Sequence, residues 1–326
     1  MNRIASPRVP LFIATFCAVA AAGCSKPPPR EGFVWIRPPG DTRAIVFGTG
    51  SAWTCGKDGY HEIDLRTRKL VADWELPYAR DLEMDDRGSL WIAHIKGLMK
   101  RSPDGKTEDL TDKLPNERAN CVYQDSKKRI WVGTWGGVAV LEHGKWRHYT
   151  KRDGLIDDMV NVVFEDSKGR MWFGSYVAPK GGVSLLTQKG RWLAIDPSNG
   201  LPHPNVTAFA ETAEGVWVAT GLHRTGGAAL LKPEDGRIKV VRRISRKTGL
   251  PGAKVRALRS DTPDGSIWLG FEYDGLAILS KEGSIRTFSK RDGLCDPEVK
   301  CIVRAPDGAI WLGTRDGITI MDGLEQ

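Results

Sequence analysis

The chain has 326 residues, of which 40% are hydrophobic and 27% are charged. This composition is typical of a soluble globular domain and argues against a disordered chain. The formal net charge of +8 suits anionic partners such as acidic glycans or phospholipid head groups, although mild basicity more often marks only a solvated surface. We expect no nucleic-acid partner.

The N-terminus has the pattern of a targeting segment. Arg3 and Arg8 flank the start of an apolar run, Val9 to Gly23, that is too short to span a bilayer and typical of a signal peptide. The run ends at Ala21-Ala22-Gly23-Cys24, which resembles a bacterial lipobox with Ala in place of the usual Leu. We therefore expect a signal peptide over residues 1–23 and lipidation of Cys24. An ordinary secretory peptide is the alternative.

The residues after Cys24 support a tethered protein. Residues 24–31 include a run of three prolines, which favours an extended, semi-rigid spacer. By resemblance to the bacterial sorting rule, Ser25 indicates the outer membrane, facing the periplasm, in a Gram-negative host. We expect an extracytoplasmic protein that contacts the membrane through its lipid anchor only, with one folded domain over residues 32–326.

A short strand centred on Trp recurs along this domain. Lys168 to Ser175 is one copy, a polar turn followed by Met-Trp-Phe-Gly-Ser. Strand-like units at intervals near forty residues are typical of propeller blades. An aromatic in a second strand fills the wedge between neighbouring sheets, so we assign the set to packing: Trp53, Trp91, Trp131, Trp172, Trp217, Trp268 and Trp311.

The polar segments before these strands predict hairpin turns, with Asp as the cap and Gly at the residue that needs a positive φ. Examples are Asp85 to Gly88 and Asp166 to Gly169. They lack the ligand spacing of an EF-hand, and we expect neither a metal nor another cofactor.

The chain ends predict how the ring closes. The seventh blade has only three strands before Gln326, and the strand-like segment Phe33 to Arg37 belongs to no N-terminal blade. We expect this segment to be the outer strand of blade seven, which would shield a sheet edge. The predicted fold is an all-β, seven-bladed β-propeller of four-stranded antiparallel blades.

Four cysteines remain in the expected oxidising compartment: Cys55, Cys121, Cys295 and Cys301. They permit three connectivities, and the sequence does not choose among them. Cys121 and Cys301 hold equivalent inner-strand positions in distant blades, so we expect no bridge between these two. None of the four has metal-ligand spacing.

The repeats resemble the two-component regulator propeller family. Gly154-Leu155, Val160 to Asp166, Gly169 to Gly174 and Gly181 to Val183 carry this resemblance in blade four. It implies a sensor or ligand-binding propeller, often for oligosaccharides. Because the sequence contains no kinase region, we carry over the binding module and not a kinase function.

Ligand binding is expected on the face formed by the loops between strands two and three and the connectors between blades, since loops on rigid scaffolds often hold binding sites. Aromatic and charged residues there suit a carbohydrate, and an envelope protein is the other partner considered. The candidates are Trp135, Tyr176, Lys180, His203, His223, Arg224, Glu272, Tyr273 and Arg315.

The leading hypothesis is a non-catalytic, lipid-anchored binding or sensor propeller. The alternative is an enzyme that resembles the streptogramin lyases, in which His203 and His223 would act with a metal. No carboxylate partner for these histidines is apparent in the sequence, so we do not expect catalysis.

Overall fold

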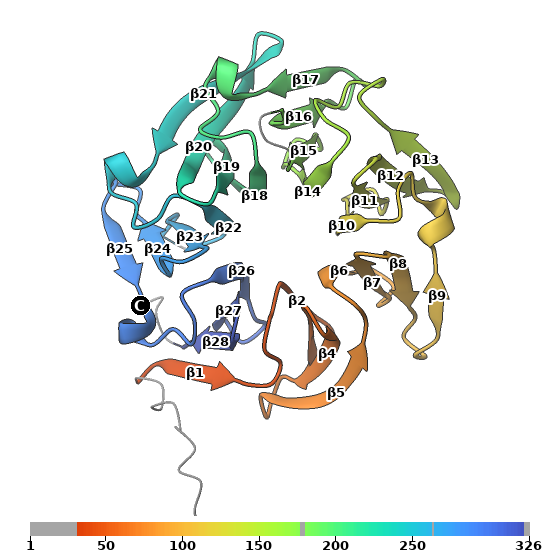
Figure 1. The fold of residues 1–326 in the computed structure, drawn as a ribbon, viewed down its shortest axis with the longest axis vertical. Coiled ribbons are helices and arrows are strands. Elements are labelled where there is room, and N and C mark those ends of the chain that lie inside the picture. The colour runs from red at the N-terminus through yellow and green to blue at the C-terminus, as the bar shows by residue number, and fades with distance from the viewer. Residues whose placement is uncertain (1–30, 177–179, 263, 323–326) are drawn as a thin grey trace, which may run out of the picture.

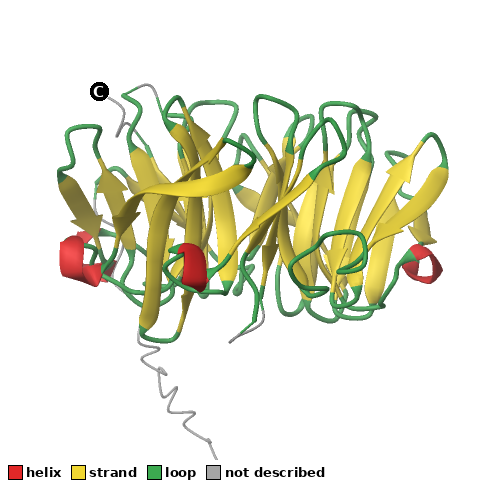
Figure 2. Ribbon diagram, turned by 90° about the horizontal axis from the view of Figure 1, so that it is seen from above, coloured by secondary structure: helices red, strands yellow, loops and turns green. Residues whose placement is uncertain are grey.

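The computed structural model describes residues 31–176, 180–262 and 264–322. They form seven four-stranded antiparallel sheets around a central axis (Figure 1), which confirms the predicted propeller. From the side, the ring is a flat disc with loops on both faces (Figure 2). The predicted signal peptide, Cys24 and the proline run lie outside the described residues. Within the described ranges, no helix has the length and apolar character needed to cross a membrane.

Each blade runs from an inner strand at the axis to an outer strand at the rim. Blades one to three contain β2 Ala44–Phe47, β3 Ser51–Cys55, β4 Gly59–Asp64 and β5 Lys69–Glu75; β6 Ala79–Met84, β7 Leu90–His94, β8 Gly97–Arg101 and β9 Thr107–Asp109; and β10 Ala119–Gln124, β11 Ile130–Thr134, β12 Gly137–Glu142 and β13 Lys145–Tyr149.

Blades four to six follow the same order. They contain β14 Val160–Glu165, β15 Met171–Ser175, β16 Val183–Leu186 and β17 Trp192–Ile195; β18 Val206–Thr212, β19 Gly215–Leu222, β20 Thr225–Glu234 and β21 Arg237–Ile244; and β22 Val255–Arg259, β23 Ile267–Phe271, β24 Leu276–Leu279 and β25 Ile285–Phe288. Short 3₁₀ turns follow four of the outer strands and lie toward one face of the disc (Figure 2): η1 Thr111–Lys113, η2 Pro197–Asn199, η3 Arg246–Thr248 and η4 Lys290–Asp292.

Blade seven joins the two ends of the domain, as the sequence predicts. Its strands are β26 Val299–Arg304, β27 Ile310–Thr314, β28 Gly317–Met321 and β1 Phe33–Ile36, with β1 at the rim. Phe33 pairs with Met321 and Ile36 pairs with Ile318. The indole Nε1 of Trp35 also donates a 2.7 Å hydrogen bond to the carbonyl oxygen of Gly293. The first described strand therefore closes the ring on the last.

The recurrent tryptophans pack between blades. Trp131, Trp172, Trp217 and Trp311 are fully buried. Trp172 lies in one cluster with Val206 and Phe209 of the next blade, at a ring-centroid distance of 6.1 Å from Phe209. Such large apolar side chains dominate the packing energy of a core, so the motif that counts the blades also holds them together.

All four cysteines of the domain are free thiols, and three of them are buried. Cys295 contacts the hydroxyls of Thr314 and Thr319 at 3.1 and 3.0 Å. Burial raises the pKa of the Cys121 thiol well above its ordinary value. These residues behave as small apolar groups of the core.

Candidate functional site

A cavity lies on the propeller axis, among the seven inner strands that surround the central opening in Figure 1. It has a volume of about 640 Å³, within the range of small-molecule sites. Side chains from all seven blades line it. The cavity is therefore a shared feature of the ring rather than of one blade.

The polar lining comes from a repeated irregularity in the inner strands. In blades two to seven the register between the first and second strands shifts at the start of the inner strand. A β-bulge of this kind re-aims the extra side chain, and Arg43 takes the same place directly before β2 in blade one. These seven cavity-lining residues form what we call the bulge ring: Arg43, Arg80, Asn120, Asn161, Thr207, Arg256 and Lys300.

Each member of the bulge ring contacts the following blade. Asn120 Nδ2 donates to the carbonyl oxygen of Val160, and Asn161 Nδ2 donates to that of Val206. The other five members also contact a residue of the next blade. Thr207 donates to Val255, Arg256 to Glu298, Lys300 to Asp41 and Arg80 to Asn120, and the guanidinium of Arg43 lies over the ring of Tyr78. The ring therefore links every blade to its neighbour around the mouth of the cavity.

The loops after the second strands join the connectors on the same face, as expected. In blade three the backbone nitrogen of Trp135 donates to the carbonyl oxygen of Arg118, and in blade four that of Tyr176 donates to Met159. The same backbone hydrogen bond, from the loop residue to the connector residue, occurs in four other blades: Ile95 donates to Tyr78, Gly221 to Asn205, Glu272 to Lys254 and Arg315 to Glu298. These bonds fix the loop residues beside the bulge ring.

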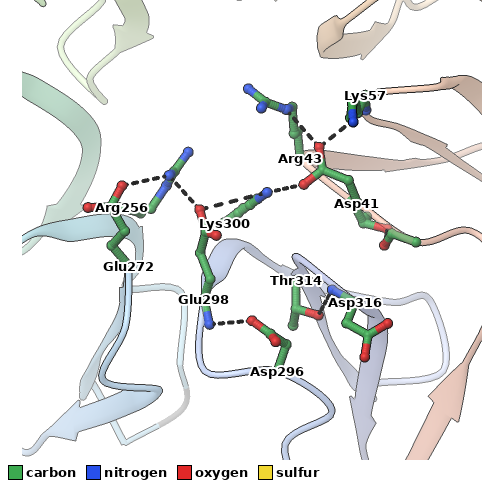
Figure 3. A network of polar contacts seen from close by, with 12 residues as sticks. Asp41, Arg43, Lys57, Arg256, Glu272, Asp296, Glu298, Lys300, Thr314 and Asp316 are labelled. Carbon is green, nitrogen blue, oxygen red and sulfur yellow. Dashed lines mark hydrogen bonds and ion pairs between the residues drawn. The ribbon is translucent and has the colours of Figure 1, made fainter.

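Across blades six, seven and one, the cations at the mouth are paired with carboxylates (Figure 3). Arg256 contacts Glu298 at 2.6 Å and Glu272 at 3.2 Å. Lys300 lies between Glu298 and Asp41, and Arg43 contacts Asp41 at 3.0 Å. Burial acts to raise the pKa of Asp41, but Lys300 and Arg43 hold it below its ordinary value.

Blades two and three form a different part of the mouth. The guanidinium of Arg118 lies 4.4 Å from the centroid of the Trp135 ring, and that of Arg80 lies 6.0 Å from it. The Trp135 indole donates to Asn120 Oδ1 at 3.0 Å, and Arg80 donates to the same oxygen. Tyr78 adds an aromatic ring that is 40% exposed. This side of the mouth combines aromatic faces with cations.

Two carboxylates lie deeper in the cavity, both on β6. Asp81 accepts hydrogen bonds from the backbone nitrogens of Val122 and Leu82, and burial raises its pKa to about 7. Burial, together with the nearby Asp81, raises the pKa of Glu83 to about 8. Both side chains face an interior that opposes their ionisation.

The structure places the predicted site residues in different surroundings. Trp135 and Tyr176 line the cavity. Glu272 is buried and paired with Lys254 at 2.7 Å, and Lys254 also lies 5.8 Å from the centre of the Tyr176 ring. The remaining candidates are not among the cavity-lining residues: Lys180, His203, His223, Arg224, Tyr273 and Arg315.

The two histidines differ from each other. His203 accepts a 3.1 Å hydrogen bond at Nδ1 from the backbone nitrogen of Asn205, and its pKa is lowered by burial and by Lys254. His223 is exposed at the tip of the β19–β20 hairpin, with a φ of 50°. Among the described residues, no group of three His, Cys, Asp or Glu side chains could hold a metal ion.

Sequence reasoning missed the bulge ring. A signal was present, because every inner strand has a polar or cationic residue near its start, ahead of the Trp of its own blade. The expected alternation of a regular strand assigns that residue to a blade face. Only the bulge places it at the axis.

Comparison with known families gives a match to the two component regulator propeller over residues 113–136, 154–177 and 293–316. The matched segments fall in blades three, four and seven and include Trp131, Trp172 and Trp311. Three segments of this seven-bladed propeller thus match the two component regulator propeller, as the resemblance in sequence indicated.

Solved structures with the same fold include two extracellular domains of hybrid two component systems from B. thetaiotaomicron. One has a TM-score of 0.77 at 22% identity and covers 91% of this chain; the other has a TM-score of 0.69 at 14% identity and covers 90%. This chain spans only 42% and 40% of their respective lengths. A catalytically inactive virginiamycin B lyase from Staphylococcus aureus, with quinupristin, has a TM-score of 0.68 at 15% identity, covering 88% of this chain and 97% of that one. These likenesses show the fold. Comparison with curated proteins gave no match.

Proposed function

We propose that this propeller is an extracytoplasmic, sensor-type binding module that takes a carbohydrate at the mouth of its central cavity. The observation that carries the proposal is the 640 Å³ cavity, in which Trp135 and Tyr176 lie beside the polar bulge ring. Aromatic rings pack on the apolar faces of sugars, while guanidinium, ammonium and amide groups donate hydrogen bonds to hydroxyls. The cavity supplies both kinds of group.

A carbohydrate suits this site better than a protein partner does. A protein scaffold would be favoured by a flat and basic face, whereas the aromatic and polar groups here surround a concavity. Concave sites with a few converging polar groups are typical of small-molecule binding. An envelope protein remains the second candidate partner.

The envelope location is part of the proposal. The similar extracellular domains and the predicted lipobox both favour an extracytoplasmic protein, anchored through a lipid on Cys24 and facing the periplasm in a Gram-negative host. Labelling with a radioactive fatty acid should mark the wild-type protein and not the Cys24→Ser variant. Equal labelling of both would contradict the anchor.

We propose binding without catalysis. The lyase hypothesis needs His203 and His223 at one site, yet neither is among the described residues that line the cavity. Similarity to virginiamycin B lyase at 15% identity indicates a shared fold and not a shared reaction. Metal-dependent cleavage of a streptogramin by the purified protein, lost in His223→Ala, would overturn the proposal.

The main test is a calorimetric and thermal-shift screen of the purified protein against a panel of oligosaccharides. For any sugar that binds, Trp135→Ala should weaken affinity by roughly tenfold or more, because a stacked aromatic contributes about 1–3 kcal/mol. The matched control is Val71→Ser, a change on the rim strand β5 where the side chain is 61% exposed. Unchanged affinity in Trp135→Ala would contradict this site.

A further inference from the structure

We infer that the mouth of the cavity contains an oxyanion subsite centred on Arg80, which takes a carboxylate, sulfate or phosphate group of the ligand. That this group belongs to an acidic oligosaccharide rests on the function proposed above. The subsite itself follows from the charges and contacts of blades two and three.

Arg80 is a partly buried cation without a compensating charge. One terminal nitrogen of the Arg80 guanidinium donates to the Asn120 side chain, but the Nε of Arg80 is buried and has no hydrogen-bond partner. Within residues 31–176, 180–262 and 264–322, no carboxylate forms an ion pair with it. A charged group that loses water without gaining a counter-ion is costly, so this arrangement is expected where a ligand supplies the charge.

The neighbouring charges strengthen the case. Burial lowers the pKa of Arg80, and the cations Arg43 and Arg118 lower it further. On the opposite side of the mouth, Lys254, Arg256 and Lys300 all pair with carboxylates. The unpaired positive charge at the mouth is therefore concentrated at blades two and three.

The carboxylate nearest in sequence does not neutralise Arg80. Both oxygens of Asp81 accept backbone hydrogen bonds, from Val122 and Leu82. Glu83 lies further along the same strand and lines the deeper part of the cavity. An anion at the mouth would therefore meet Arg80 before it meets either acid.

Two aromatic residues flank the same point. The centroid of the Trp135 ring lies 4.4 Å from the guanidinium of Arg118 and 6.0 Å from that of Arg80, and the indole nitrogen donates a hydrogen bond to Asn120. Tyr78 lines the cavity, is 40% exposed and has a φ of 49°. Few non-glycine residues adopt this backbone region, and here it holds the Tyr78 ring at the cavity. A sugar ring that carries an acidic group matches this pairing of aromatic and cation.

The test compares a charged ligand with its neutral counterpart. The probes are trigalacturonate, its methyl ester, and inorganic sulfate and phosphate, at constant ionic strength. Arg80→Gln removes the proposed anchor. Arg152→Gln, on the exposed connector between β13 and β14, removes the same charge from the same face and controls for general electrostatics. Affinity is measured by calorimetry and folding by thermal melting.

We expect the wild type to bind trigalacturonate roughly 10- to 100-fold more tightly than the ester, as charge-assisted hydrogen bonds predict. Arg80→Gln should abolish that preference, and Arg152→Gln should keep it. The melting temperature of Arg80→Gln should equal or exceed that of the wild type, since an uncompensated charge is removed. If that variant fails to fold, Arg80→Lys provides the test and should retain only part of the preference.

The remaining outcomes separate the two proposals. Equal binding of ester and acid, with no effect of Arg80→Gln, would overturn the subsite and leave carbohydrate binding intact. Stabilisation by sulfate or phosphate alone, lost only in Arg80→Gln, would support the subsite and contradict a carbohydrate ligand. Failure of all four probes to bind the wild type would overturn the subsite.

Discussion

The indole Nε1 of Trp172 donates a 2.8 Å hydrogen bond to Oδ2 of Asp166, the residue that also caps the preceding hairpin. The other oxygen of this carboxylate accepts from the backbone nitrogens of Lys168 and Arg170. Blades two and three repeat the arrangement with Asp85 and Trp91, and with Asp125 and Trp131. One carboxylate therefore shapes the turn and satisfies the buried indole of its blade.

Blade seven lacks this carboxylate, and the consequence is visible. Ala305 occupies the corresponding position, and the indole nitrogen of Trp311 is buried without a partner. Replacing Ala305 with Asp should supply the acceptor and stabilise the protein by about 1 kcal/mol. The converse change, Asp85→Ala, should destabilise it by about 2–3 kcal/mol, since several buried donors lose their acceptor.

Both changes are measured by urea unfolding. Ala305→Asn provides a control with a neutral acceptor of similar size. Destabilisation by Ala305→Asp together with stabilisation by Ala305→Asn would show that the cost of burying the charge exceeds the gain from the bond. A decrease of less than about 0.5 kcal/mol in the free energy of unfolding of Asp85→Ala would contradict the dual role of the carboxylate.

The periodic Trp made the blade count predictable from sequence, because a large aromatic at a fixed strand position recurs only in a repeated unit. The ring closure was predictable from the strand-like segment Phe33 to Arg37, which belongs to no N-terminal blade. The predicted outer strand of blade seven, Phe33 to Arg37, agrees with β1 Phe33–Ile36 to within one residue. The regular spacing of apolar residues along the chain indicates which side chains face the core. It therefore describes the architecture well and says little about residues that depart from the pattern.

One turn contains such a departure, at Lys128. It takes the place held by Gly88 and Gly169 in neighbouring blades, with a φ of 66°. A non-glycine residue is strained in this region. Lys128→Gly should therefore stabilise the protein by about 0.5 kcal/mol or more, measured as a higher urea midpoint.

The control for this change lies in the same turn. Lys127 precedes Lys128 and is not among the residues with positive φ, so Lys127→Gly should be neutral or destabilising, since glycine there only adds freedom to the unfolded chain. The same gain from both variants would mean that loss of a surface lysine, and not relief of strain, caused it.

The site was harder to predict than the fold for a geometric reason. Trp135 could be named from the sequence because it is an aromatic residue of a loop between the second and third strands of its blade, and it does line the cavity. Arg80 and Asn120 sit within strands, and only a bulge turns them toward the axis. Whether a cation of the bulge ring forms an ion pair depends on residues of other blades, which are distant in sequence. No local pattern could therefore reveal which cation lacks a carboxylate partner.

The carboxylates of the inner cavity predict a pH dependence. The folded-state pKa of Glu83 is raised from 4.5 to about 8, and that of Asp81 from 3.8 to about 7. Folding therefore favours the protonated forms, and their contribution to stability is complete below about pH 4 and is lost as the pH rises toward 8. Glu83→Gln should raise stability at pH 8.5 by about 1–2 kcal/mol and change it little at pH 4.

Urea unfolding at several pH values checks this prediction. Glu108→Gln, on the exposed strand β9, is the matched control and should leave the pH profile unchanged. An equal effect of Glu83→Gln at both pH values would indicate altered packing and not altered ionisation.

Ring closure by β1 gives the last prediction. Ile36 is buried in a cluster with Ile45, Ile63 and Trp311, so it joins blade seven to blade one. Ile36→Ala should cost about 2–4 kcal/mol, as expected for a buried large-to-small change, whereas Val71→Ala at the exposed rim should cost almost nothing. Because the closed ring has no terminal blade, the loss should appear in the single unfolding transition of the whole propeller and not as fraying of β1 alone. Truncation after Leu279, which removes β25 to β28, should abolish that cooperative transition. A truncated chain that melts as sharply as the full protein would show that the blades are stable without closure.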